Sequence, residues 1–463
     1  MDIVLSVLAS EIVSRSISSV IAKYHKQSSM DKLARLEQVL LRAHTIVEEA
    51  EGKQISNQGM ILQLRQLRKN MYRGYYVLDT YKRHGAAVRQ PLNFNKFRVV
   101  FENLEDSINN MKEFVMFLMD CPRIFRKPYS TYLFMERCMF GRHAEKEHII
   151  NFLLQTSDSS LSVLPIVGPP EIGKRTLVEH VCKEERVRKQ FSQIVHINSN
   201  GMNQLVTDAQ SSSEHGEEFS SARPLIVVDL GHDGDDATWR RVRSLICHTY
   251  GDKSRVLLIS TAEGVSLSRL GTTQALRMKK LHRDEYWYYF KTIAFGSANP
   301  DDHHQLLPSI AKKIVTHIDG SFIAANVIAR LLQADLSEAF WRYVSEYVKK
   351  TTQYRHHVHG GCAQYRIREG RPFYLGNPVY GPLLLCYQCH ETAGPLMESE
   401  LPKIKGADLI TRGSTIPREG KLEVLRWQST IPPYRSYIAS CEVQDPQLVM
   451  MPREKHLKRK RHV

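Results

Sequence analysis

A ten-residue stretch, "GPPEIGKRTL" at 168–177, has the residue types and spacing that hold phosphate groups in proteins. In the pattern Gly-x4-Gly-Lys-Ser/Thr, a glycine-rich turn directs backbone N–H groups at phosphate oxygens, and the lysine reaches the outer phosphates. Gly168, Gly173 and Lys174 satisfy this pattern. We therefore predict that these three residues bind a phosphorylated ligand.

The position after the lysine departs from the pattern, because Arg175 stands where a serine or threonine would ligate Mg²⁺. A guanidinium has no acceptor atom and cannot ligate a cation. Thr176 lies one position too late for that role, although its hydroxyl or backbone can still contact an inner phosphate. We expect both residues to contribute to a site that handles Mg²⁺ poorly. Such a site favours binding a diphosphate over hydrolysing a triphosphate, and we assign it neither a metal ligand nor a catalytic residue.

A second candidate, Asp229, ends the apolar segment "PLIVVDL". An aspartate in this place is the usual second metal-site residue of proteins with such a loop. The alternative is an ordinary aspartate at the end of a strand. The next residue is Leu230, which cannot position a water molecule for hydrolysis.

These residues require a fold that holds them at one edge of a sheet. Between 163 and 261 short apolar segments alternate with helical patterns, which predicts a parallel sheet buried on both faces. We assign residues 141–298 to a P-loop NTPase-like α/β domain and residues 299–350 to a small helical domain. The expected strands are "VLPIV", "QIVHIN", "PLIVVDL" and "RVLLIST".

Residues 1–120 read as four amphipathic helices, the first at roughly 3–24, and 121–140 as a linker. Four apolar stripes that no helix can bury alone predict a four-helix bundle. Dimerisation or membrane contact through the first helix is the alternative. The stripes of the other three helices are Leu33, Leu36, Leu40, Ala43 and Val47; then Ile61, Leu64, Leu67, Met71, Tyr75 and Leu78; then Phe97, Val100, Leu104, Ile108, Met111, Val115 and Leu118.

Composition excludes several classes of protein. The net charge of +15 is spread thinly apart from the tail "REKHLKRKRHV", so we expect no specific nucleic-acid binding. No segment is apolar and long enough to span a membrane, and the N-terminus lacks the features of a signal peptide. Eight scattered cysteines suit a reducing compartment. These features predict a cytoplasmic protein, with nuclear import through the basic tail left open.

Residues 351–463 show no assignable fold and are expected to be irregular, with strand-like pieces such as "LLLCYQ" and "SYIASCEV". The segment "CYQCH" has the spacing of a haem attachment site, which an unexported protein would not use. A zinc site from Cys386 and Cys389 with His359 or Cys362 lacks the second half of a strong signature. Buried thiols in a strand are the favoured interpretation.

Taken together, the segments resemble the N-terminal part of plant disease-resistance proteins. These immune receptors join a coiled-coil domain, a nucleotide-binding switch (NB-ARC) and leucine-rich repeats (NLR proteins). The resemblance covers roughly residues 1–345, and the chain closely resembles the shorter grass members. Its segments include "MYRGYYVLDTYKRH", "MFGRHAEKEHIINFLLQ", "LPIVGPPEIGKRTLVEHVCKEERVRKQF", "PLIVVDL", "SRVLLISTAEG" and "GSFIAANVIARLL".

The resemblance implies that Gly168, Gly173 and Lys174 cradle the phosphates of ADP or ATP, with Asp229 as the acidic-strand residue. Several family features are missing: the Met-His-Asp motif, the proline of the Gly-Leu-Pro-Leu motif (here "GSFI") and a run of leucine-rich repeats.

Two functions remain open on the sequence alone. One is a defence switch that binds ADP or ATP and signals through its helical bundle to itself or to other immune receptors. The other is a nucleotide-independent scaffold that pairs with full-length receptors. An active ATPase is the weakest alternative, since Arg175 and Leu230 replace groups that Mg²⁺ and water need.

Overall fold

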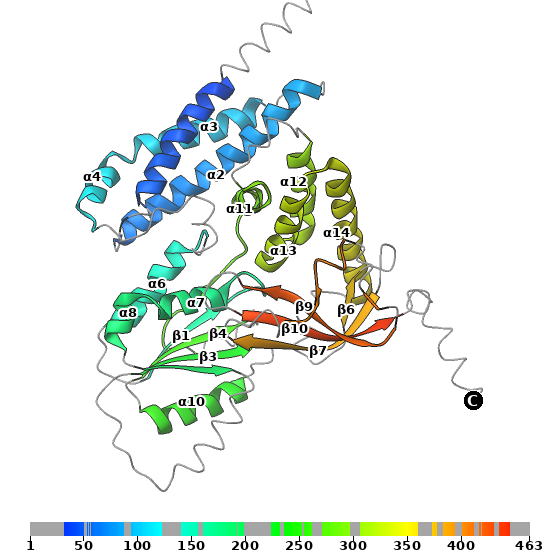
Figure 1. The fold of residues 1–463 in the computed structure, drawn as a ribbon. Coiled ribbons are helices and arrows are strands. Elements are labelled where there is room, and N and C mark those ends of the chain that lie inside the picture. Colours follow the sequence, from blue (N-terminus) through cyan, green and yellow to red (C-terminus); the bar gives the residue numbers. More distant parts are fainter. Residues whose placement is uncertain are drawn as a thin grey trace, which may run out of the picture. The chain divides into compact units, whose positions relative to one another are not determined.

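The computed structural model describes the chain in segments, which divide into two compact units, Met1–Pro128 and Tyr129–Val463 (Figure 1). Each unit is described by itself. Among the helices that the structure describes, none is long and apolar enough to cross a membrane. The described residues are 32–50, 53, 55, 57–87, 94–122, 140–155, 161–191, 193–198, 224–231, 236–251, 254–261, 271–296, 306–359, 373–376, 383–393, 401–411, 416–417, 419–429 and 435–444.

The first unit contains a helix at 32–50, α2 (Gln58–Ala87), α3 (Phe94–Asn109) and α4 (Lys112–Asp120). Most residues of their predicted stripes are buried, with Leu36, Leu67 and Leu104 fully so. The prediction is wrong for Val115, which is 38% exposed on α4. The expected first helix lies outside the described residues. The predicted last helix is divided in two, because the backbone turns at Asn110 and Met111 before α4 begins.

Helix packing in this unit depends on a glycine. A Cβ atom at Gly74 on α2 would lie 2.7 Å from Leu40 Cδ2 and 3.3 Å from Leu104 Cδ2. Those leucines come from the helix at 32–50 and from α3, so three helices converge at this point. A larger residue would force the two leucines apart, because buried side chains already fill the space.

The second unit contains the predicted parallel sheet, with strand order β2-β3-β4-β1-β5 and parallel pairing throughout. Helices α6 (His143–Leu154), α7 (Lys174–Cys182) and α8 (Glu185–Gln190) cover one face, and α10 (Asp236–Tyr250) covers the other (Figure 1). The strands are β1 (Ser162–Val167), β2 (Ile194–Asn198), β3 (Leu225–Gly231), β4 (Arg255–Ser260) and β5 (Leu276–Arg277).

Alternate residues of each strand enter two separate apolar cores. In β3, Val227 packs with the residues of α6 and α7, whereas Val228 packs with those of α10. This two-sided burial explains why the strands read as continuous apolar runs. It confirms the fold class predicted for this part of the chain.

Among the described residues, four further helices follow the sheet: α11 (Arg283–Phe295), α12 (Leu307–Ile318), α13 (Phe322–Ala334) and α14 (Glu338–His359). The ring of Tyr289 on α11 meets that of Phe322 on α13 edge to face, with centroids 4.9 Å apart. The rings of Phe295 and Trp341 join α11 to α14, with centroids 5.0 Å apart.

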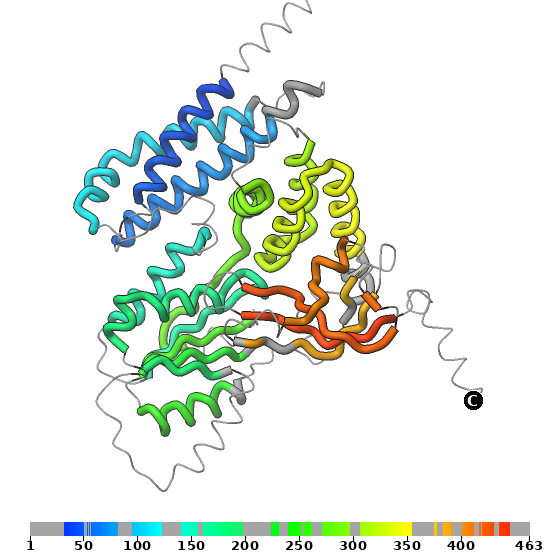
Figure 2. Tube along the Cα trace, in the orientation of Figure 1, coloured from blue at the N-terminus to red at the C-terminus, as the bar shows by residue number. Residues whose placement is uncertain are grey.

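The C-terminal region, left without a fold by the sequence, contains a second five-stranded sheet with the order β6-β7-β10-β9-β8. In Figure 2 the tubes of this region are orange to red. All pairs are antiparallel except β8 with β9. The strand-like pieces noted in the sequence lie in β7 and β10. The strands are β6 (Phe373–Gly376), β7 (Leu383–Ala393), β8 (Ile404–Lys405), β9 (Lys421–Gln428) and β10 (Arg435–Gln444).

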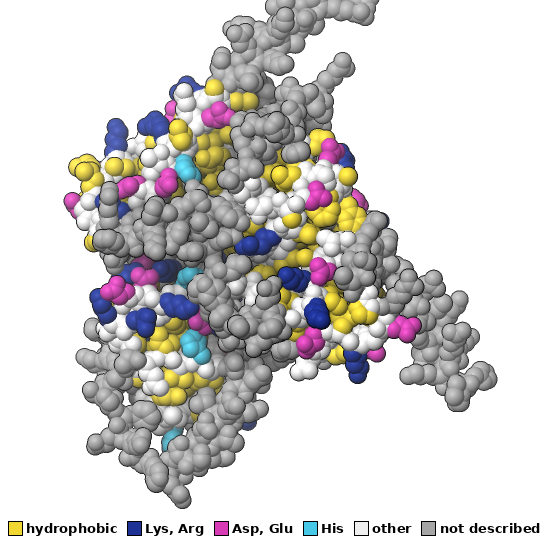
Figure 3. Space-filling model, in the orientation of Figure 1, with side chains coloured by type: hydrophobic (Ala, Val, Ile, Leu, Met, Phe, Trp, Pro, Cys, Tyr) yellow, Lys and Arg dark blue, Asp and Glu magenta, His cyan; other side chains and the backbone are white. Residues whose placement is uncertain are grey.

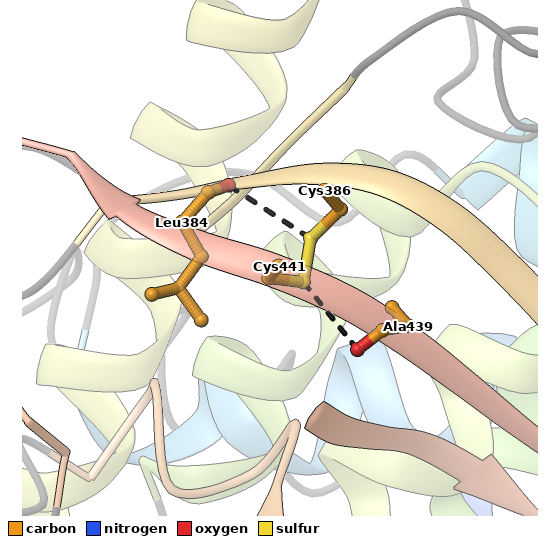
Figure 4. The surroundings of a disulfide bond; sticks show 4 residues. All are labelled: Leu384, Cys386, Ala439 and Cys441. Atoms are coloured by element: carbon orange, nitrogen blue, oxygen red, sulfur yellow. Dashed lines mark hydrogen bonds between the residues drawn. A yellow bond between two sulfur atoms is a disulfide. The ribbon is translucent and has the colours of Figure 1, made fainter. Parts of the chain in front are cut away.

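A disulfide joins Cys386 of β7 to Cys441 of β10, which are register partners with Cα atoms 3.9 Å apart (Figure 4). The expectation of buried free thiols is therefore wrong for Cys386. A disulfide sulfur cannot serve as a thiolate ligand, so Cys386 is not available as a ligand of the zinc site considered from the sequence. Within the described residues, no group of three or more His, Cys, Asp or Glu could hold a metal ion.

Candidate functional site

The loop between β1 and α7 is built around two glycines. Gly168 has a φ of +156°, and a Cβ atom there would lie 2.2 Å from the carbonyl oxygen of Met278. Gly173 precedes α7 in the left-handed region, with φ 85° and ψ 23°. Side chains are disfavoured at both positions, so the glycine spacing read from the sequence matches a steric requirement of the loop.

Lys174, the first residue of α7, lies across this loop. Its side chain is buried, and Nζ donates to the carbonyl oxygens of Gly168, at 2.7 Å, and Pro169, at 2.6 Å. A buried ammonium group is expensive unless it is hydrogen-bonded, and the loop carbonyls meet that need. The arrangement holds a positive charge at the N-terminus of α7, where the helix dipole also favours an anion.

Arg175 and Asp229, predicted separately for the site, are paired with each other. The Nε of Arg175, on the first turn of α7, donates to Oδ2 of Asp229 near the end of β3. Both side chains are largely buried, with 25% of the arginine and 12% of the aspartate exposed. The second residue after Lys174, Thr176, lies half-buried on the same turn, and its role stays a prediction.

Leu230 is 4% exposed and packs in the apolar core that contains Trp239 of α10. At the end of the next strand, β4, Thr261 is also buried. The carboxyl ends of β3 and β4 thus present Asp229 and Thr261 beside the loop that follows β1, where ligands of open parallel sheets bind.

Glu171 is a site residue that the sequence did not indicate. It has a φ of 60°, which is uncommon for a residue with a side chain. Its carbonyl oxygen accepts from the backbone N–H of Phe322 at 3.1 Å, and its carboxylate accepts from the hydroxyl of Ser321. Because Ser321 is the N-cap of α13, the loop is joined to the start of that helix. The only sequence signal was a serine directly before an apolar helix.

Tyr286 supports the same junction from α11, since its hydroxyl donates to the carbonyl oxygen of Ser321 at 2.6 Å. Burial, and to a smaller extent the neighbouring Tyr289, raises the pKa of Tyr286 well above its ordinary value. The phenol therefore stays protonated and continues to donate at neutral pH.

Arg142 holds the opposite side of the loop. This buried residue precedes α6 and donates to the carbonyl oxygens of Lys279, at 2.8 Å, and Ile172, at 3.4 Å. It also pairs with Glu145 at 3.4 Å. The sequence placed Arg142 at the start of a domain but assigned it no role, because carbonyl partners 30 and 137 residues away leave no local pattern.

The second sheet contacts the helix behind the loop. Arg435, the first residue of β10, donates to Glu179 of α7 at 2.7 Å. His196 of β2 lies 3.6 Å from the same carboxylate. The C-terminal region, unassigned from the sequence, is therefore attached to the element that carries Lys174 and Arg175.

On the face drawn in Figure 3, basic and acidic side chains are interspersed among the described residues. Within the described part of that face, side chains of the two signs lie among one another and form no extended patch of a single sign.

Comparisons with known proteins find relatives among plant disease resistance proteins, although no protein-family model matches the chain. The chain is 22% identical over 351 residues to putative disease resistance protein RGA1 of Solanum bulbocastanum, covering 68% of this chain and 35% of that protein. It is 24% identical over 358 residues to disease resistance protein RGA2 of the same plant, covering 68% and 36%. A third relative, putative disease resistance protein At3g14460 of Arabidopsis thaliana, is 25% identical over 230 residues, covering 45% and 16%. The chain thus spans about a third of the length of the first two relatives.

Solved structures with some likeness include Drosophila ORC bound to DNA, with a TM-score of 0.29 and 14% identity over 50% of this chain and 78% of that chain. Another is RuvB of Thermotoga maritima, with a TM-score of 0.24 and 13% identity over 41% and 55%. The strand order and the parallel pairing of the first sheet carry the assignment of the fold.

Proposed function

We propose that this chain acts in plant innate immunity as an NLR-like protein of the short, grass type, binding ADP or ATP in the loop at 168–174. One observation carries the proposal: Lys174 is buried across a glycine loop that joins a central parallel strand to a helix. This combination concentrates backbone N–H groups, a helix N-terminus and a lysine on one small volume, which suits a diphosphate. The similarity to disease resistance proteins supports the assignment to defence.

The switch would operate through the junction of the loop with α13. Glu171 belongs to the loop and contacts Ser321 and Phe322 at the start of that helix. A nucleotide that favours one geometry of the loop therefore favours one position of α13, because a ligand shifts an equilibrium by its differential affinity for the two states. The helical bundle of the first 120 residues would pass the signal to protein partners, through self-association or binding to other immune receptors.

A nucleotide-independent scaffold is the alternative function, and one observation favours it. Lys174 is hydrogen-bonded to its own loop, and Arg175 is paired with Asp229. The donors of Lys174 thus have partners within the loop, and the charge of Arg175 is balanced by Asp229. In that case the chain would act only through protein partners, including full-length receptors.

Turnover of ATP is at most very weak in this proposal. The residue after Lys174 is Arg175, which cannot ligate Mg²⁺, and the residue after Asp229 is the buried Leu230. Neither position offers a group that activates water. The proposed location is the cytoplasm, with entry into the nucleus through the basic tail as the alternative.

The identity of any retained nucleotide tests the proposal directly. The purified chain is denatured, and the released small molecules are separated by anion-exchange chromatography. We expect wild type to release close to one ADP molecule per protein chain, and Lys174→Ala to release little. Lys189→Ala, which removes an exposed lysine paired with Glu185 on α8, is the matched control and should retain ADP.

An empty wild-type protein that also fails to bind added ADP, while showing a cooperative thermal transition, would contradict the switch and support the scaffold. Equal retention by wild type and Lys174→Ala would show that the loop is not the site. Either result would leave the similarity to disease resistance proteins intact while removing the nucleotide from the mechanism.

A further inference from the structure

The residues around the loop do not fit a magnesium ion. Mg²⁺ requires oxygen ligands in octahedral geometry, usually one or two from the protein and the rest from water and phosphate. The hydroxyl position is taken by Arg175, and its guanidinium is bonded to Asp229, the carboxylate that would face the metal. A cation placed between them would meet a fixed positive charge at contact distance.

We infer that the guanidinium of Arg175 replaces the metal, so that the loop binds a nucleoside diphosphate without Mg²⁺. This inference rests on the proposed function, since it concerns the same loop. In this arrangement Arg175 neutralises Asp229 and donates to a phosphate oxygen, so it supplies the positive charge that Mg²⁺ would otherwise provide.

The position of Arg175 supports this role. It follows Lys174 on the first turn of α7, at the end of the helix where the dipole favours anions. A guanidinium has five N–H donors in a rigid fork, so one side chain can hold a carboxylate and a phosphate oxygen together. A lysine ammonium is a compact point charge and lacks this planar geometry.

Partial burial strengthens the pair. With 25% of Arg175 and 12% of Asp229 exposed, the two charges lie at the sheet edge in a region of lower polarity than water. An arginine held in this way is pre-organised, which lowers the cost of ordering it when a ligand arrives. A diffusible ion would have to lose its hydration shell instead.

Charge balance selects the ligand. Lys174 and Arg175 supply two positive charges, and Asp229 removes one of them. The triphosphate carries an additional negative charge that Mg²⁺ normally neutralises. Without the metal, the loop should prefer ADP to ATP.

Isothermal titration calorimetry of the full chain with ADP, in excess Mg²⁺ and in EDTA, tests the inference. For wild type we expect dissociation constants that agree within about twofold between the two conditions. Arg175→Thr restores the hydroxyl, and we expect it to bind ADP about tenfold more tightly with Mg²⁺ than in EDTA. Arg188→Thr, an exposed arginine on α8, is the matched control and should behave as wild type.

A second variant separates the two types of site even if Arg175→Thr is poorly folded. Asp229→Asn should bind ADP at least as tightly as wild type in both conditions, since the guanidinium gives up a competing partner. In a magnesium site the same change removes a group that holds the metal and weakens binding only in the Mg²⁺ sample.

The outcomes are distinguishable. Wild-type binding that requires Mg²⁺ would overturn the inference while supporting the proposed nucleotide site. Metal-independent binding by Arg175→Thr would also overturn it, because the arginine would then not be the group that replaces the metal. An absence of ADP binding in every condition, in a protein with an intact thermal transition, would overturn both the inference and the proposed nucleotide site.

Discussion

The backbone N–H of Phe322 donates to the carbonyl oxygen of Glu171 across 3.1 Å, and the hydroxyl of Ser321 reaches the carboxylate of the same glutamate. Two consecutive residues at the start of α13 are thus bonded to one residue of the phosphate loop. The loop is held from a helix about 150 residues away in sequence.

This junction gives a first prediction. Ser321→Ala removes both the cap of α13 and the bond to Glu171, and should lower the free energy of unfolding by about 2 kcal/mol. Ser337→Ala is the matched control, because Ser337 caps α14 and removing it deletes a helix cap alone. It should cost about 1 kcal/mol. Urea denaturation measures both, and equal losses would show that the Glu171 bond adds nothing.

The steric role of Gly168 gives a second prediction. Gly168→Ala places a Cβ atom 2.2 Å from the Met278 carbonyl oxygen, a backbone atom that cannot move aside cheaply. We expect a loss of at least about 2 kcal/mol in unfolding free energy. Gly251→Ala is the control: its φ is also positive, at +76°, but nothing in the described part of the chain lies within 4 Å of the added atom. It should lose about 1 kcal/mol, and a similar loss in both variants would exclude the close approach.

The bond between Arg435 and Glu179 predicts energetic coupling between the second sheet and α7. A double-mutant cycle of Arg435→Met and Glu179→Gln should give a coupling energy of about 1–2 kcal/mol, because both side chains are largely buried. The exposed pair Lys189 and Glu185 provides the control cycle and should give well under about 1 kcal/mol. No coupling in the first cycle would mean that the sheet is not attached at this point.

The disulfide predicts sensitivity to reduction. Cys386 and Cys441 are 55 positions apart in sequence, so Cys441→Ser should lower the stability of the second sheet by about 2–4 kcal/mol. Cys121→Ser, outside the disulfide, should have little effect. Differential scanning calorimetry with and without reductant measures the change. Mass spectrometry of unreduced peptides should find the Cys386–Cys441 link, and finding both as free thiols would contradict it.

His180 on α7 predicts a dependence of stability on pH. Burial first, and then Lys146 and Lys183, lowers its pKa from 6.5 to about 4, against the smaller opposing effect of Glu179 and Glu184. Between pH 6.5 and pH 4 the histidine is protonated in the unfolded chain but neutral in the folded chain. Its contribution to the free energy of unfolding is therefore complete above about pH 6.5 and is lost as the pH falls toward 4.

Replacing this histidine isolates its contribution from that of the carboxylates. The glutamine of His180→Gln does not titrate in this range. The unfolding free energy of wild type minus that of the variant should therefore fall as the pH is lowered from about 7 to about 4.5. A difference that stays constant across the series would show that His180 is protonated equally in the folded and unfolded chain.

The strands of the parallel sheet and the glycines of the loop could be predicted from local patterns in the sequence. The strands at 162–167 and 225–231 are short, apolar and followed by helices, and the glycine spacing at 168 and 173 is a property of one turn. Such features are determined by neighbours in sequence, so they can be read without knowing the rest of the chain.

Contacts between distant segments could not be read in this way. Arg175 and Asp229 were each assigned to the site, but nothing in either segment indicates that one neutralises the other. The second sheet was missed because its strands pair across loops of varying length, and a bulge shifts the register at Ser440 and Cys441. The break after Asn109 depends on one turn within an otherwise continuous apolar pattern.

The two apolar cores of the parallel sheet have a consequence for how a substitution spreads through the domain. Val227 and Val228 are adjacent in sequence, yet they belong to packing environments separated by a layer of backbone. A substitution confined to the α10 side changes the packing around Val228 without touching the side chains that pack with α7. The sheet therefore acts as a partition between the side chains beneath the loop and those on its opposite face.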